Sequence, residues 1–318
     1  MKLIIQIPCY NEEKTLSITL KKLPREVEGF DKVEWLIIND GSIDNTVKIA
    51  KENGVDHVVN FSKNQGLARG FMAGLDECIS LGADVVVNTD ADNQYNADDI
   101  PKLVKPILEG KADIVVGTRP ISQIKHFSPI KKMLQKLGSW TIRVASNTRV
   151  EDAPSGFRAI SRDAAMKLNV FNGYTYTLET IIQAGSKNMS ITSVPIRVNE
   201  YLRPSRLIKS ISAYIKRSIL TIFRIFVVYK PFRFFMTLGF ILFILGLIPG
   251  IRFLIYFFIE GGKGHIQSLI LSAILLLMGV QLGIVALIGD LLAVNRRLLE
   301  DVQYRLRKFE ADRNNKKK

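Results

Sequence analysis

Short apolar runs and amphipathic stretches alternate along the first 120 residues. The apolar runs are rich in Val and Ile and end in Pro, Gly, Asn or Asp, which is typical of buried strands. The stretches between them repeat apolar residues at helical spacing. The predicted strands are 2–8, 33–39, 57–61, 85–90 and 113–117, and the predicted helices are 12–23, 44–53, 66–80 and 97–109. This alternation predicts an α/β fold with a doubly wound, mostly parallel sheet.

The pattern changes in the C-terminal third of the chain. Residues 234–259 and 266–294 form two long apolar runs that are separated by a short polar turn. At about 1.5 Å per helical residue, each run exceeds the roughly 30 Å hydrocarbon core of a bilayer. The two runs therefore predict a transmembrane hairpin. Gly239, Gly246 and Gly250 share roughly one face of the first run, which favours a homo-oligomer formed through the membrane helices.

Two stretches near these runs are basic and amphipathic. Residues 125–147 and 207–232 repeat Lys and Arg among large apolar residues at helical spacing. This pattern suits a helix lying in a membrane interface, although a helix packed on the sheet fits the first stretch equally well. Residues 295–318 predict a charged helix followed by a basic tail.

The net charge of +14 is unevenly distributed. Residues 1–199 contribute +2 and residues 200–318 contribute +12, so the basic excess coincides with the apolar runs. This distribution indicates contact with an anionic membrane face and argues against a nucleic-acid-binding protein. Lys and Arg flank the hairpin on both sides, whereas its turn holds only Lys263. The positive-inside rule therefore predicts an integral protein of the cell membrane with its N-terminal domain and both termini in the cytoplasm.

Polar residues follow each predicted strand. Asp90 and Asp92 close the apolar run 83–89, which places both carboxylates at the carboxyl edge of the sheet, where ligands bind in open α/β folds. One carboxylate can hold Mg²⁺ or Mn²⁺ bridging two phosphates, while the other binds a sugar or nucleotide hydroxyl. A solvated acidic loop is the alternative for such a pair in isolation. Asp40, after the second strand, can accept hydrogen bonds from a nucleotide base.

Taken in order, these motifs resemble those of the family 2 glycosyltransferases of the GT-A fold, and most closely the polyprenyl-phosphate glycosyltransferases. The matching segments are 8–12, 40–44, 64–70, 90–94, 117–119, 152–158 and 205–206. The resemblance implies a GT-A catalytic domain over residues 1–206, followed by an amphipathic juxtamembrane helix at 207–232. Two transmembrane helices would then occupy 233–294, and a basic cytoplasmic helix and tail would occupy 295–318.

The resemblance also implies a role for individual residues. Asp92, together with Asp90, would bind the metal on the donor diphosphate. The catalytic set would be Asp92, Asp152, Arg119 and Arg206. The nucleotide-sugar would contact Pro8, Tyr10, Asn11, Glu12, Asp40, Gly66, Arg69, Asp90, Ala91 and Gln94. The acceptor phosphate or its lipid would contact Arg119, Lys131, Arg158, Glu179, Arg203 and Arg206.

The implied reaction is the inverting transfer of a sugar from a UDP- or GDP-sugar to a membrane polyprenyl phosphate, with Mg²⁺ or Mn²⁺ as the cofactor. A lipid phosphate is largely ionised at neutral pH, so Asp152 would mainly orient it. The main alternative is a hydroxyl acceptor on a lipid-linked saccharide or glycolipid, for which Asp152 would act as general base. A third hypothesis is that the protein is a non-catalytic membrane scaffold, and the intact acidic pair argues against it.

Overall fold

The computed structural model describes residues 1–120, 138–140, 142–144, 146–170, 176–200, 220, 223–224, 226–261 and 265–315. The chain divides into two compact units. The first unit comprises residues 1–218 and 300–318, and the second comprises residues 219–299. Most of the two predicted amphipathic stretches, 125–147 and 207–232, lies outside the described residues, as do Lys131, Arg203 and Arg206.

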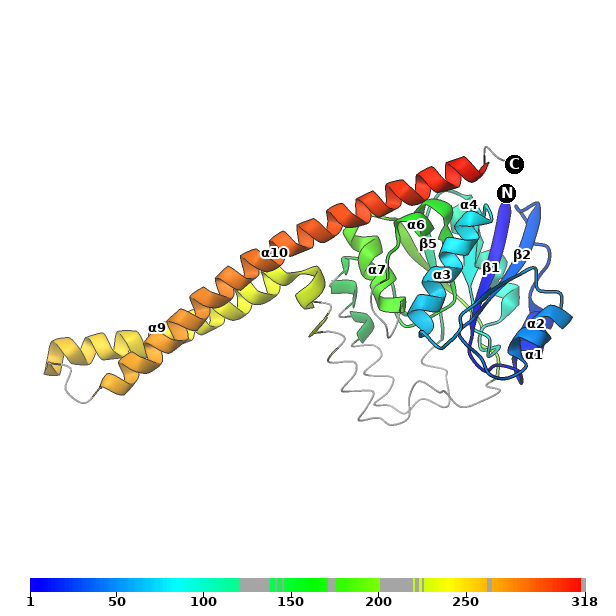
Figure 1. The fold of residues 1–318 in the computed structure, drawn as a ribbon. Coiled ribbons are helices and arrows are strands. Elements are labelled where there is room, and N and C mark those ends of the chain that lie inside the picture. The colour runs from blue at the N-terminus through cyan, green and yellow to red at the C-terminus, as the bar shows by residue number, and fades with distance from the viewer. Residues whose placement is uncertain are drawn as a thin grey trace. The chain divides into compact units, whose positions relative to one another are not determined.

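The first unit is built on a seven-stranded sheet (Figure 1). Its strands are β1 (Lys2–Cys9), β2 (Lys32–Asn39), β3 (His57–Asn60), β4 (Val85–Asn88), β5 (Ile114–Thr118), β6 (Arg158–Ser161) and β7 (Ile191–Pro195). They are arranged in the order β3-β2-β1-β4-β6-β5-β7, and only β6 runs antiparallel to its neighbours. The predicted α/β fold with a mostly parallel sheet is confirmed, although the sequence pattern did not indicate β6 and β7.

Helices cover both faces of this sheet. The helices are α1 (Leu16–Lys22), α2 (Thr46–Glu52), α3 (Leu67–Ser80), the 3₁₀ turn η1 (Ala97–Asp99), α4 (Ile100–Leu108), α6 (Arg162–Lys167) and α7 (Thr177–Ser186). Residues Leu3, Ile5 and Ile7 of β1 join α1 and α4 in one buried apolar cluster. Helix α3 packs on the opposite face, where Gly74 allows close approach because a Cβ there would lie 2.8 Å from Ile38 Cδ1.

The antiparallel direction of β6 determines what lies near the acidic pair. The parallel strands β1, β2, β4 and β5 end at one edge of the sheet, whereas β6 begins at that edge. Arg158, the first residue of β6, therefore lies opposite Asn88, the last residue of β4. This register brings the segment before β6, residues 152–157, next to the residues that follow β4.

The last part of α10 (Ile266–Asn315) belongs to the first unit from Glu300 onward, as the predicted charged helix. Arg307 donates from Nη1 to the carbonyl oxygens of Met166 and Leu168 at 3.2 and 2.7 Å. These carbonyls lie at the C-terminal end of α6, where helical partners are lacking and a cation is favoured. Arg307 also forms an ion pair of 2.9 Å with Asp76 on α3. This segment is thus a packed part of the first unit.

The second unit contains α9 (Pro231–Glu260) and the apolar part of α10. Both helices are long and apolar enough to cross a membrane, with mean hydropathies of 2.4 and 2.5 over their most apolar windows. The glycine face of α9 packs on α10 of the same chain, since a Cβ at Gly239 would lie 2.8 Å from the carbonyl oxygen of Gly279. Ser272 Oγ donates to the carbonyl oxygen of Gly246 at 2.8 Å. The glycines thus serve the hairpin itself, and oligomerisation stays a prediction.

Candidate active site

The loops after β1 and β2 are interlocked at the carboxyl edge of the sheet. The backbone N–H of Asn11 donates to Ser42 Oγ at 2.9 Å, and Asn11 Oδ1 accepts from the backbone N–H of Ile43 at 2.9 Å. Gly41 has φ of +68°, and a Cβ there would lie 2.5 Å from the carbonyl carbon of Lys63. Only glycine fits this turn without displacing backbone. The two loops therefore form one preformed wall of the predicted nucleotide site.

Asp40 anchors the next loop to this wall. Its Oδ1 accepts from the backbone N–H of Gln65 at 2.6 Å, and its Oδ2 accepts from that of Gly66 at 3.0 Å. The loop leads into α3, on whose first turn Arg69 lies exposed. The structure thus assembles the predicted nucleotide-side residues at one edge of the sheet, with Glu12 and Asp40 buried and Tyr10 exposed.

Asp90 and Asp92 lie just beyond β4 at the same edge. Asp92 Oδ1 accepts a hydrogen bond from the backbone N–H of Gln94 at 3.1 Å. Burial, reinforced by the neighbouring Asp92 carboxylate, raises the pKa of Asp90 to about 7. Two carboxylates that oppose each other's ionisation are stabilised by a nearby cation. The pair therefore has the electrostatic character of a cation site.

The donor set of this pair fits Mg²⁺ or Mn²⁺ held together with a diphosphate. Within the described residues no group of three or more His, Cys, Asp or Glu side chains could hold a metal ion. A cation of this kind needs only one or two protein carboxylates, because phosphate oxygens and water complete its octahedral shell. Asp92, which is only partly buried, and Asp90 supply hard oxygen ligands of the required type.

A buried network of polar side chains lies at the end of β4, directly before the acidic pair. Asn88 Oδ1 accepts from Gln6 Nε2 at 2.9 Å, and Asn88 Nδ2 donates to the Gly156 carbonyl oxygen and to Tyr176 Oη at 2.9 and 2.8 Å. The Gly156 N–H donates to Tyr95 Oη at 3.0 Å. Sequence reasoning missed Asn88, Tyr95 and Tyr176. The available signal was an Asn at the end of an otherwise apolar strand.

Arg119 and Asp152, predicted separately, form one ion pair. Asp152 Oδ2 accepts from Arg119 Nε at 2.7 Å, and Oδ1 accepts from Nη2 at 3.0 Å. The backbone N–H of Arg119 also donates to Oδ2 at 3.2 Å. Both side chains are buried, with 9% and 0% of their surface exposed. Charge-assisted, bidentate bonds of this kind fix the orientation of both groups.

Arg158 was predicted to contact the acceptor, but its side chain lies in the protein interior. It is fully buried, and its guanidinium donates to the carbonyl oxygens of Ser155 and Ala153 at 2.8 and 2.7 Å. This burial argues against direct contact with an acceptor, because the whole guanidinium lies inside the protein. Glu179 is also buried and lies in the first turn of α7.

Asn199 holds the loop that follows the acidic pair, and sequence reasoning did not identify it. Its Nδ2 donates to the carbonyl oxygens of Asn93 and Tyr95 at 2.9 and 3.1 Å. Its backbone N–H donates to the carbonyl oxygen of Gln94 at 2.9 Å. These bonds fasten residues 93–95 to the segment after β7. The chain is therefore held by hydrogen bonds both before the acidic pair, at Asn88, and after it, at residues 93–95.

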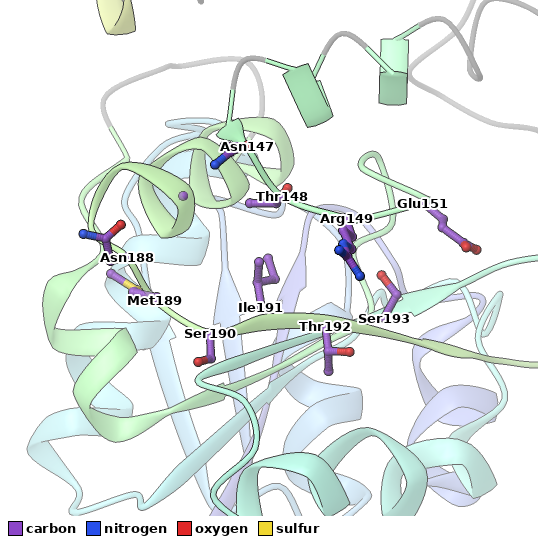
Figure 2. A pocket seen from close by; sticks show the side chains of 11 residues that line it. Asn147, Thr148, Arg149, Glu151, Asn188, Met189, Ser190, Ile191, Thr192 and Ser193 are labelled. Atoms are coloured by element: carbon purple, nitrogen blue, oxygen red, sulfur yellow. The ribbon is translucent and has the colours of Figure 1, made fainter.

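A separate cavity of about 530 Å³ lies along β7. Figure 2 shows residues 147–151 on one side of it and residues 190–193 of the β7 segment on the other. Arg149 and Glu151 are the charged side chains in its lining. None of the predicted site residues that the structure describes lines this cavity, so it is distinct from the acidic pair.

Parallel strands that present paired carboxylates, with an antiparallel strand inserted beside them, define a GT-A-like transferase fold. Residues 4–168 match the model of "Glycosyl transferase family 2", and the chain belongs to this family. The resemblance stated from the motifs is thereby confirmed.

Several similar proteins are named after a lipid phosphate. The chain is 32% identical over 213 residues to UDP-N-acetylglucosamine--dolichyl-phosphate N-acetylglucosaminyltransferase of Methanococcus voltae, covering 60% of this chain and 83% of that protein. It is 27% identical over 207 residues to undecaprenyl-phosphate mannosyltransferase of Micrococcus luteus, covering 62% and 83%. A solved structure of glucosyl-3-phosphoglycerate synthase from Mycobacterium tuberculosis with Mn²⁺, UDP and phosphoglyceric acid shares the fold, with a TM-score of 0.54, 20% identity and coverage of 70% and 78%.

Proposed function

We propose that this protein transfers a sugar from a nucleotide-sugar to a membrane polyprenyl phosphate, with inversion at the anomeric carbon and with the help of Mg²⁺ or Mn²⁺. The observation that carries the proposal is the acidic pair, held at the carboxyl edge of the sheet beside the buried Arg119–Asp152 pair. The names of the similar proteins, and the two helices able to cross a membrane, support the lipid phosphate as acceptor.

The donor would lie across the ends of β1, β2 and β4. Asp40 and the interlocked loops would hold the nucleoside, while Asp90 and Asp92 would hold the cation on the diphosphate. The bound cation would neutralise the negative charge that develops on the departing nucleoside diphosphate. The hydrogen bonds of Asn88 and Asn199 hold the backbone around the acidic pair, so that little reorganisation would accompany the reaction.

The acceptor would approach from the side of Asp152. The second pKa of a phosphate monoester lies near 6, so the lipid phosphate is already a nucleophile at neutral pH and needs orientation more than a base. Both oxygens of Asp152 accept hydrogen bonds from Arg119, which fits an orienting role. Arg119, whose charge is balanced by Asp152, would hold this carboxylate in a fixed orientation for the phosphate.

We place the catalytic unit and both termini on the cytoplasmic side. Lys and Arg lie on both flanks of the α9–α10 hairpin, and cytoplasmic ends of membrane helices carry this excess. Nucleotide-sugar donors would then reach the acidic pair directly from the cytoplasm.

A substrate panel tests the proposal. Purified protein in detergent is incubated with UDP- and GDP-sugars, Mn²⁺ or Mg²⁺, and a short polyprenyl phosphate, and released nucleoside diphosphate and glycosylated lipid are measured. The matched control is the same polyprenol without its phosphate. Transfer to the phosphate alone supports the proposal. Transfer only to the polyprenol or to a glycolipid hydroxyl would contradict it.

A further inference from the structure

Arg158 is the largest of the fully buried side chains in the described part of the chain. It opens β6 directly opposite Asn88 of β4. Besides its bonds to the carbonyl oxygens of Ser155 and Ala153, its Nη1 donates to Thr180 Oγ1 on α7. A buried guanidinium with three protein partners around it joins three elements, namely β6, the turn before it and α7.

Both carbonyl oxygens belong to the turn that carries Asp152. The Ser155 N–H donates to the Asp152 carbonyl oxygen at 3.1 Å, which closes the turn. At one end of this turn Asp152 meets Arg119. At its other end Gly156 lies against the acidic pair, since a Cβ there would be 3.1 Å from Asp90 Oδ1. The geometry of this turn therefore sets the distance between the acceptor side and the metal side of the site.

The chemistry of the side chain suits this task. Arginine presents its donors in a rigid planar fork, which can hold two carbonyl oxygens and a hydroxyl in fixed directions. The three bonded groups carry no formal charge. Burial lowers the pKa of Arg158 only to about 10, so the side chain stays cationic at neutral pH. Lysine would keep the charge but would lose the fork.

We propose that Arg158 is a positioning residue, which fixes the Asp152–Gly156 turn and thereby sets the Arg119–Asp152 pair for the acceptor. This inference rests on the proposed function for the identity of the acceptor. It replaces the direct phosphate contact that the sequence suggested for Arg158 with an indirect role through the turn.

The test compares Arg158→Lys with wild type in steady-state assays, varying donor and acceptor separately. We expect the KM for the acceptor to rise at least about tenfold and kcat to fall, while the KM for the nucleotide-sugar stays within about twofold. A loss of folded protein would lower kcat alone and leave both KM values unchanged. The split between the two KM values therefore separates positioning from general destabilisation.

Arg162→Lys is the matched control. Arg162 follows β6 in the chain, and its Nη1 donates to the Ala83 carbonyl oxygen at 3.0 Å, away from the turn. Both KM values should be unchanged in this variant. Thr180→Val removes the bond between Arg158 and α7, together with the bonds of Thr180 Oγ1 to the carbonyl oxygens of Tyr176 and Thr177 in the same helix. It keeps the bonds of Arg158 to the two carbonyl oxygens of the turn. It should raise the acceptor KM by a smaller factor, about two- to fivefold, and it carries the test if Arg158→Lys does not fold.

The outcomes keep the two proposals apart. Wild-type protein that does not use polyprenyl phosphate refutes the proposed function, and the variants are then measured with the acceptor that the wild type does use. An unchanged acceptor KM in folded Arg158→Lys, or in Thr180→Val if the former does not fold, would overturn the positioning role. Equal increases in the donor and acceptor KM values would overturn it as well.

Discussion

Replacing Asp152 with Asn removes one charge of the buried pair with Arg119 while keeping the shape of the side chain. The pair is bidentate, with distances of 2.7 and 3.0 Å, and its members expose 0% and 9% of their surface. Removing one partner of a buried pair leaves the other charge uncompensated and costs about 3–5 kcal/mol. For a folded unit of this size each kcal/mol lowers Tm by about 2–4 °C, so we expect Tm to fall by about 10 °C.

The assay is thermal unfolding of the detergent-solubilised protein, followed by tryptophan fluorescence, since Trp35 is buried on β2. Arg119→Gln should cost a similar amount, and the double variant should cost clearly less than the sum of the two. Glu52→Gln is the control, because its pair with Lys48 is 4.0 Å long and exposed at 60% and 73%; it should cost at most about 0.5 kcal/mol. Additive single effects, or losses below about 1 kcal/mol, would refute the reasoning.

Three further predictions concern stability and activity elsewhere in the first unit. Burial alone would raise the pKa of Glu34, but its bonds to Lys2, Lys32 and His57 lower it to about 2. The stabilisation from this lowered pKa is complete above pH 4.5 and is lost as the pH falls toward 2, so Glu34→Gln should cost about 1–2 kcal/mol at pH 7 and almost nothing near pH 2 in denaturant titrations. Gly156→Ala would place a Cβ 2.9 Å from Tyr176 Oη and 3.1 Å from Asp90 Oδ1, so it should lower Tm by several degrees and kcat at least about tenfold; wild-type turnover would contradict this. Arg307→Ala should lower Tm by several degrees, because it removes the bonds to the C-terminal end of α6 and the ion pair with Asp76 on α3. Hydrogen exchange that becomes faster in residues 162–168 would confirm this, and unchanged exchange there would contradict it.

The sequence predicted the first five strands, β1 to β5, and the helices between them, because their apolar periodicity is local. It did not indicate β6 and β7, since the short β6 has Arg158 at its start and is recognisable only by pairing with β4 and β5, far away in the chain. The start of α1 was predicted at residue 12. In the structure Glu12 lies in a turn, where its Oε2 accepts a hydrogen bond from Thr15 Oγ1, and the helix begins at Leu16.

The same reasoning explains which site residues were predictable. The acidic pair and Asp40 follow predicted parallel strands, so their position at one edge came from topology alone. The pairing of Arg119 with Asp152 depends on the direction of β6, and the burial of Arg158 depends on two carbonyl oxygens converging on it. Neither property is visible in a linear motif, because arginines are usually found at the surface.

The most direct test of the cation site is the metal dependence of Asp92→Asn. Release of nucleoside diphosphate is measured with polyprenyl phosphate over a titration of Mn²⁺, in parallel with wild type and with folding verified by Tm. We expect kcat to fall at least about 100-fold and the remaining activity to lose its response to Mn²⁺. Wild-type turnover with an unchanged Mn²⁺ titration would contradict the assignment of the acidic pair as the site that holds the donor diphosphate.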